Sequence, residues 1–146
     1  MAVCVEEPVI IRADVDTFFQ VVTNVEAYPE FLTSIRSVDL LRKNPREIWA
    51  GVDSHLVLDW HYLQVLRPEF PHRIAWEMVE GPFREAGGEW LITNVHADRL
   101  ETLYVARIEF GRLIPRRLLE MGMRVALPEL LRQYAARMEA CALQPA

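Results

Sequence analysis

Residues 114–143 constrain the fold most, because they form the one long run with sustained helical periodicity. Advancing by about 100° per residue collects a single apolar stripe along the whole run. The stripe consists of Leu119, Met123, Leu127, Leu130, Leu131, Tyr134, Met138 and Cys141. It predicts an amphipathic helix that packs one face against the rest of the protein. Pro128 lies inside this run and lacks an amide proton, so we expect a kink or local break near Arg124.

A second apolar patch lies on the opposite side of the same helix, in its first half only. Its members are Ile114, Leu118, Met121 and Val125. Leaving such side chains in water forgoes roughly 1.5–3 kcal/mol each compared with full burial. We therefore expect cover, either by the segments around Tyr28, Phe31 and Phe83 or by a second copy of the chain. We favour local cover, because Gly122 suits the close approach of a loop, and a monomer and a homodimer both stay open.

The size and composition of the chain are those of a globular protein. Its 146 residues predict a single domain spanning 1–146, and 51% hydrophobic with 25% charged residues is a typical balance. The net charge of −5 argues against a general nucleic-acid surface, which needs a basic excess. Arg112, Arg116 and Arg117 form a local basic cluster that fits a solvated helix start better than a phosphate site.

The two cysteines, Cys4 and Cys141, lie near opposite ends and offer no metal-ligand spacing. No secretory segment and no long apolar run is evident, so we expect a cytoplasmic, reduced protein without a membrane span. The sequence indicates neither a metal site nor a cofactor.

Short strand-like segments and two short helices precede the long helix. A first strand is expected at 3–11, a helix capped by Asp14 follows, and a second helical turn spans 28–32. About six further strands are expected between 37 and 110. This order predicts an α+β fold, in which a curved antiparallel sheet of about seven strands wraps around the long C-terminal helix.

The segment 46–66 has the pattern of a hairpin. If the chain turns at Ser54-His55, Trp49 lies opposite Trp60. One face then carries Trp49, Leu58, Trp60, Tyr62 and Gln64, and the other carries Asp59 and His61 among apolar residues. Neither face is clearly polar, so alternation alone does not say which one points inward. In the following strands, Met78 shares a face with Ile74 and Trp76, and Trp90 shares one with Ile92.

Two segments carry a resemblance to a known family. The run Phe19-Gln20-Val21-Val22-Thr23-Asn24-Val25-Glu26-Ala27-Tyr28-Pro29-Glu30-Phe31-Leu32 resembles the first-helix signature of the START-like (SRPBCC) proteins. Val79-Glu80-Gly81-Pro82-Phe83, followed by Gly88-Glu89-Trp90, resembles their second signature. The nearest branches are the coenzyme Q-binding and ribosome-association-toxin group and the polyketide cyclase/dehydrase group. The resemblance covers essentially the whole chain, but these branches differ in function.

The resemblance implies a helix-grip fold with an apolar cavity between the sheet and the C-terminal helix. Carried over by position, it puts Trp60, Tyr62, Gln64, Met78 and Trp90 on the cavity side, and Trp49 joins them as the expected partner of Trp60. These six are the expected ligand-binding residues. Bulky, polarisable side chains suit stacking on a flat ring system, although the same side chains also suit the filling of a core.

Signs of catalysis are few. The chain has no nucleophile elbow, no zinc-protease motif and no phosphate-binding glycine loop. Asp59 and His61 have a spacing that suits acid–base work, but the resemblance puts them on the outer face. In the aromatase/cyclase branch we expect a tyrosine and an arginine where this chain has Ile35 and Gln64. Catalytic residues are therefore unknown, and whether the protein is an enzyme stays open.

Three functional hypotheses follow. The leading one is a protein that encloses a small hydrophobic ligand, such as an isoprenoid quinone, a lipid or an aromatic polyketide, with Tyr62 and Gln64 orienting a ligand oxygen. The second is a polyketide aromatase/cyclase or dehydratase that works mainly by folding its substrate. The third is a ribosome-associated interaction module that uses the second apolar patch of the helix.

Overall fold

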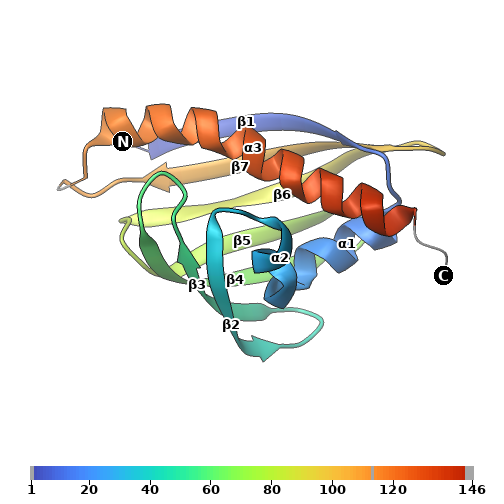
Figure 1. The fold of residues 1–146 in the computed structure, drawn as a ribbon, viewed down its shortest axis with the longest axis horizontal. Coiled ribbons are helices and arrows are strands. Elements are labelled where there is room, and N and C mark those ends of the chain that lie inside the picture. Colours follow the sequence, from blue (N-terminus) through green and yellow to red (C-terminus); the bar gives the residue numbers. More distant parts are fainter. Residues whose placement is uncertain (1, 113, 144–146) are drawn as a thin grey trace.

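The computed structural model describes residues 2–112 and 114–143, which form a seven-stranded antiparallel sheet with a long helix across one face (Figure 1). The strands are β1 (Ala2–Ile11), β2 (Ile35–Lys43), β3 (Ile48–Ser54), β4 (Trp60–Glu69), β5 (Arg73–Glu80), β6 (Glu85–Val95) and β7 (Leu100–Glu109). The helical elements are α1 (Val15–Thr23), the short 3-10 turn η1 (Val25–Ala27), α2 (Tyr28–Phe31) and α3 (Arg116–Ala142). The expected α+β helix-grip architecture is confirmed.

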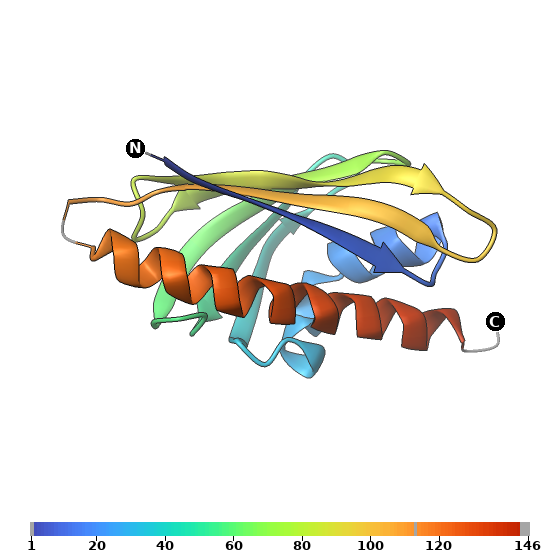
Figure 2. The ribbon, with the colours of Figure 1, turned by 90° about the horizontal axis from the view of Figure 1, so that it is seen from above.

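The strands lie in the order β1-β7-β6-β5-β4-β3-β2, so the first two strands of the chain occupy opposite edges of the sheet. The segment α1-η1-α2 makes this crossing. An edge strand exposes unpaired backbone groups, which proteins commonly cover. Here α3 packs beside β1, and α2 with η1 packs beside β2. Seen from above, α3 runs along the whole length of the sheet that curves over it (Figure 2).

Helix α1 packs against α3 and touches β4. Its first turn is capped as expected, because the Asp14 carboxylate accepts a hydrogen bond of 2.8 Å from the amide of Thr17. The apolar side of α1 points inward, and Phe18 is fully buried. The Phe18 ring meets Trp90 edge-on with 5.0 Å between ring centroids. This contact packs α1 against β6 of the sheet.

Helix α3 runs without a break through Pro128, so the local break, one of the two outcomes expected near Arg124, is wrong. Proline removes one backbone hydrogen bond inside a helix and leaves the carbonyl four residues earlier without its donor. Both Arg124 and Pro128 are exposed. The orphaned carbonyl therefore lies on the solvent side, where water replaces the lost donor at little cost. In the described part of the chain, no helix is long and apolar enough to cross a membrane.

The expected apolar stripe of α3 faces the sheet. Leu119, Leu127, Leu131 and Met138 are buried, and the other members of the stripe are half-buried. This side of α3 therefore forms the roof over the concave face of the sheet, as its periodicity predicted.

Three of the four members of the second apolar patch are exposed and Ile114 is half-buried, so the expected local cover of the patch is wrong. Leu118, Met121 and Val125 keep 62%, 69% and 78% of their surface in contact with solvent. Tyr28 and Phe31 pack on the ring of Tyr134 instead, much farther along the helix.

Gly122 does admit a loop, as expected, but the loop is the one between β3 and β4. A methyl group at Gly122 would lie 2.7 Å from Cγ1 of Val57. This approach brings the β3–β4 loop against the first half of α3 while it leaves the exposed patch uncovered.

Candidate ligand-binding cavity

A cavity of about 150 Å³ lies between the sheet and the middle of α3. Its walls come from β2 to β7, from α1, α2 and α3, and from the loops next to Leu56 and Phe83. Eight aromatic residues contribute to the lining: Tyr28, Trp60, Tyr62, Trp76, Phe83, Trp90, Tyr104 and Tyr134. Aliphatic side chains and the two half-buried methionines Met78 and Met123 fill most of the remainder. The cavity therefore offers flat, polarisable walls.

Five of the six expected ligand-binding residues line this cavity: Trp60, Tyr62, Gln64, Met78 and Trp90. The alternation of each strand explains their placement, because every second side chain points to the same face. On β4 this face carries Trp60, Tyr62 and Gln64, and on β5 it carries Met78 opposite Gln64. Whether these side chains bind a ligand stays a proposal.

Trp49, the sixth expected residue, lies on the other face of the sheet, so its expected place in the cavity is wrong. The inward face of β3 carries the buried residues Ile48, Ala50, Val52 and Ser54. Trp49 pairs with Val65 rather than Trp60, five residues along β4 from the expected partner. An odd shift in register moves a side chain to the opposite face. The shift arises because the chain turns over residues 55–59 and not at Ser54-His55.

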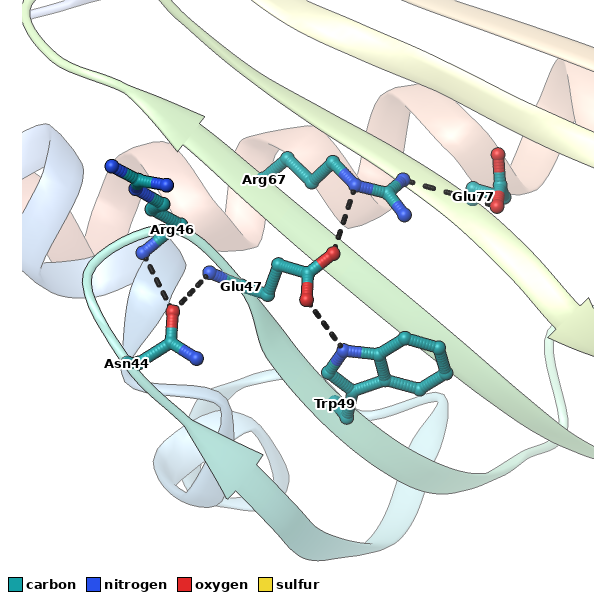
Figure 3. A network of polar contacts seen from close by, with 6 residues as sticks. All are labelled: Asn44, Arg46, Glu47, Trp49, Arg67 and Glu77. Carbon is teal, nitrogen blue, oxygen red and sulfur yellow. Dashed lines mark hydrogen bonds and ion pairs between the residues drawn. The ribbon is translucent and has the colours of Figure 1, made fainter.

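On this outer face Trp49 takes part in a polar network with neighbouring strands (Figure 3). The Glu47 carboxylate accepts hydrogen bonds of 3.3 Å from the Trp49 indole and 3.3 Å from the Arg67 guanidinium. Arg67 also lies 3.8 Å from Glu77 on β5. Asn44 holds the turn before β3 by accepting from two backbone amides, each at 2.9 Å. The indole of Trp49 is thus a hydrogen-bond donor on the outer face of the sheet.

The tyrosines of the cavity are neutral. All four tyrosines of the chain line it. Burial raises the pKa of Tyr62 to about 12 and raises the pKa of Tyr28, Tyr104 and Tyr134 well above the ordinary value of about 10. At neutral pH these phenols therefore act as uncharged hydrogen-bonding groups and not as bases.

Two of the three cavity tryptophans use their indole N–H within the protein. The Trp60 indole donates to the Leu56 carbonyl at 3.0 Å, and the Trp90 indole donates to the Thr102 hydroxyl at 2.9 Å. The Thr102 hydroxyl in turn donates a hydrogen bond of 2.7 Å to the Val9 carbonyl. The indole N–H of Trp76 is buried and has no hydrogen-bond partner among the described residues. A buried donor without a partner is uncommon in folded proteins.

The cavity carries no charge among the described residues that line it, and it holds no histidine or cysteine there. Across 2–112 and 114–143, no three histidine, cysteine, aspartate or glutamate side chains are grouped so that they could hold a metal ion. The arrangement can enclose an apolar ligand and hydrogen-bond to it, whereas proton transfer near neutral pH has no suitable group here.

Asp59 and His61, the pair with acid–base spacing, lie outside the cavity. Asp59 pairs with Arg36 at 2.8 Å, and its side chain is 69% exposed. His61 is 83% exposed and lies 3.8 Å from Asp53. Both placements agree with the expected outer face, and neither side chain reaches the cavity.

Several lining residues were missed at the level of the sequence. Trp76 lies between Ile74 and Met78 in a cleanly alternating strand, so the same alternation that selects Met78 also selects Trp76. Tyr134 belongs to the apolar stripe of α3, and the expectation that parts of this helix line the cavity did not name it. Tyr104 follows from the alternation of β7 once its register against Trp90 is known.

Solved structures with the same fold include enzymes and lipid-transfer proteins. The Zhui aromatase/cyclase from Streptomyces sp. R1128 is 15% identical, with a TM-score of 0.80 over 97% of this chain and 94% of that one. A START superfamily protein from Mycobacterium smegmatis is 16% identical, with a TM-score of 0.75 over 95% and 96%. A STAR-related lipid transfer protein fragment from Xanthomonas axonopodis is 15% identical, with a TM-score of 0.78 over 91% and 84%. At such identities the likeness establishes the fold alone.

No curated protein matches the sequence. One family model does match it, over residues 11–135, and it describes "Polyketide cyclase / dehydrase and lipid transport". This match spans the elements that form the cavity, from the end of β1 through most of α3. The chain therefore belongs to the polyketide cyclase/dehydrase and lipid transport family, within the START-like (SRPBCC) proteins.

Proposed function

We propose that the protein binds a small, neutral, hydrophobic ligand in the cavity between the sheet and α3. The observation that carries the proposal is the cavity itself, which aromatic and aliphatic side chains line without any charged group among the described residues. Pockets of this kind usually hold apolar ligands and use a few polar groups to orient them. Membership of a family associated with lipid transport and polyketide cyclisation supports the same class of ligand.

The size of the cavity limits what it encloses without rearrangement. Its volume of about 150 Å³ is near that of a protein cavity known to take up benzene, and ligands of drug size need roughly 300–1,000 Å³. A single aromatic or quinone ring therefore fits as the structure stands. An isoprenoid tail, an acyl chain or a multi-ring polyketide requires α3 or the loop at residues 55–59 to move outward.

The proposed contacts divide into walls and a polar end. Trp60, Met78 and Trp90 provide surfaces for stacking against a ring. Tyr62 and Gln64 are the groups that orient a ligand oxygen, since Tyr62 stays protonated and Gln64 is 8% exposed at the cavity wall. Trp49 leaves the proposed set because it lies on the outer face.

A polyketide aromatase/cyclase or dehydratase is the second candidate, and the family match favours it. Two side chains that line the cavity argue against this second candidate. Ile35 and Gln64 line the cavity at the positions where the cyclase branch leads us to expect a tyrosine and an arginine. Such an enzyme would depend on folding its substrate and on neutral hydrogen bonds, since no acid–base pair faces the ligand.

Mass spectrometry of material extracted from natively purified protein tests the binding proposal. We expect the parent protein to carry a neutral, apolar compound. Ala106 is 2% exposed and lines the cavity, so Ala106→Leu fills part of it and should lower the bound amount at least about tenfold.

Ala75→Leu is the matched control, because Ala75 pairs with Arg67 and Glu89 on the outer side of β5. It should leave the bound amount unchanged. Equal loading of both variants, or a charged compound in the parent, would refute binding in this cavity.

A further inference from the structure

Three members of the second apolar patch remain in contact with solvent, although their side chains are large and apolar. Leu118, Met121 and Val125 follow one another along α3 at steps of three and four residues, which places them on one side of the helix. Each of them is exposed by 62% or more. Isolated exposed apolar side chains are common, but a contiguous group of this kind usually marks an interaction surface.

Arginines border the patch along one side and at its start. Arg117 and Arg124 are two helical turns apart and form a row beside the patch, and Arg112 and Arg116 precede it. All four are exposed. Residues 112–128 hold these four of the 16 lysines and arginines of the chain but only one of its 21 acidic residues, a glutamate that pairs with Arg124 at 3.1 Å. In a protein of net charge −5, this end of α3 is thus a local basic surface.

The loop between β3 and β4 lies beside the first half of α3 and borders the patch on the side away from the arginine row (Figure 1). Val57 of this loop lies against Gly122, and its neighbour Leu58 is 44% exposed, so the loop adds apolar surface next to the patch. Leu56 of the same loop lines the cavity. The patch and the cavity are therefore separated by one short loop.

We infer that the first half of α3 is a docking surface for a membrane that contains anionic lipids. Helices with an apolar and a basic side lie in the membrane surface, with the apolar side chains among the lipid chains. Leu118, Met121 and Val125 enter the apolar layer, and the basic row of Arg117 and Arg124 lies at the lipid phosphates. The inference goes beyond the proposed function, since these five side chains, all within the described part of the chain, lie outside the cavity lining.

Charge favours a membrane over a second copy of the chain as the partner. Antiparallel pairing of two copies through the patch sets the arginine row of each copy against the same row of the other, and like charges repel. A membrane with anionic lipids offers the opposite charge together with an apolar layer. If the proposed function holds, docking here also brings the cavity wall at Leu56 to the phase in which apolar ligands collect.

Flotation of the protein with lipid vesicles tests the inference. The vesicles consist of phosphatidylcholine alone, or of phosphatidylcholine with about one third phosphatidylglycerol as the anionic lipid. We expect binding to the anionic vesicles to be at least about tenfold stronger than to the neutral ones, and to weaken as salt is added, because salt screens the arginines. Absence of binding to the anionic vesicles, or equal binding to both kinds, would overturn the inference.

Polar substitutions of nearly the same shape locate the docking surface. The combined variant Met121→Gln, Val125→Thr should lower binding to anionic vesicles at least about tenfold, because two exposed side chains no longer gain from entering the apolar layer. Arg117→Gln should lower it about fivefold, the usual contribution of one basic residue at an anionic surface. Arg117→Gln also keeps the test decisive if the combined variant fails to fold.

Val95→Thr and Arg99→Gln are the matched controls, because they make the same kinds of change at the other end of the sheet. Val95 is 60% exposed and pairs with Leu100 at the start of β7, whereas α3 follows the end of β7. Both controls should bind anionic vesicles as the parent does. If they weaken binding as much as the α3 variants, the protein docks through overall charge and apolar surface, and the assignment to α3 is refuted.

Two further measurements separate this inference from its rivals. Sedimentation without vesicles should give the parent and the combined variant the same mass; a lower mass for the variant would show that the patch joins copies of the chain, and would overturn membrane docking. Mass spectrometry should find the same amount of bound compound in both proteins. Vesicle binding by a parent whose cavity carries no compound would leave docking standing and refute the proposed function. A loaded cavity without vesicle binding would do the reverse.

Discussion

Two adjacent leucines of α3 test the orientation of the helix on the sheet. Leu119 is 1% exposed and belongs to the buried stripe, whereas Leu118 is 62% exposed and belongs to the second patch. Replacement of a fully buried leucine by alanine costs about 2–5 kcal/mol, from lost transfer free energy and the cavity left behind. At Leu118 only the buried minority of the side chain counts toward the roughly 1.5–3 kcal/mol of full burial. We therefore expect Leu118→Ala to cost less than about 1 kcal/mol.

Urea titration of the two variants at matched protein concentration gives the free energies of unfolding and their slopes. Alanine is at least as good a helix former as leucine, so helix propensity does not confuse the comparison. Losses of similar size at Leu118 and Leu119 would refute the orientation of α3. Sedimentation of Leu118→Asp extends the test to assembly. A mass below that of the parent, with folding intact, would identify the exposed patch as a contact between copies.

Three further predictions concern the sheet, the outer face and the tyrosines. Gly88→Ala should lower the free energy of unfolding by roughly 1–3 kcal/mol, because the new methyl group collides with a backbone carbonyl of β7. Gly111→Ala is the control: its methyl group meets nothing within 4 Å, so the same denaturant titration should show no change. Asp59→Asn and His61→Gln should leave the amount of co-purifying ligand unchanged in mass spectrometry, since both side chains are exposed outside the cavity; loss of bound ligand would contradict their placement. The contribution of the tyrosines to stability should be fully present below their unfolded pKa of about 10. It should be lost as the pH rises through the folded pKa, about 12 for Tyr62; phenolate absorbance of the folded protein at about pH 10 would contradict this.

Local patterns predicted the parts of the fold that short-range physics determines. The cap of α1 follows from Asp14 and its contact with the Thr17 amide. The buried stripe of α3 follows from helical periodicity, which needs no knowledge of the neighbours. Pro128 is also explained locally, since water on the exposed side of the helix replaces the backbone hydrogen bond that this proline removes.

Pairings between strands were harder to predict, and the β3–β4 hairpin shows why. Its loop contains Val57 at φ 72°, a left-handed conformation that β-branched residues rarely adopt. Turn rules look for glycine or asparagine at such positions, so they missed this loop and chose a tighter turn at Ser54-His55. The resulting error in register was enough to put Trp49 on the wrong face.

The position of β1 at the edge beside β7 has a consequence for biosynthesis. Ala2 pairs with Glu109 and Ile11 with Leu100, so β1 has no neighbour in the sheet until β7 has been made. The strands from β2 to β7 pair in the order in which they are synthesised. At about 5–20 residues per second, the ribosome takes roughly 5–20 s to produce the hundred residues between the two partners. During that interval Val3 and Val5, buried in the folded protein, have no core to enter. Closure of this edge, which joins the most distant parts of the chain, is therefore a late step in folding.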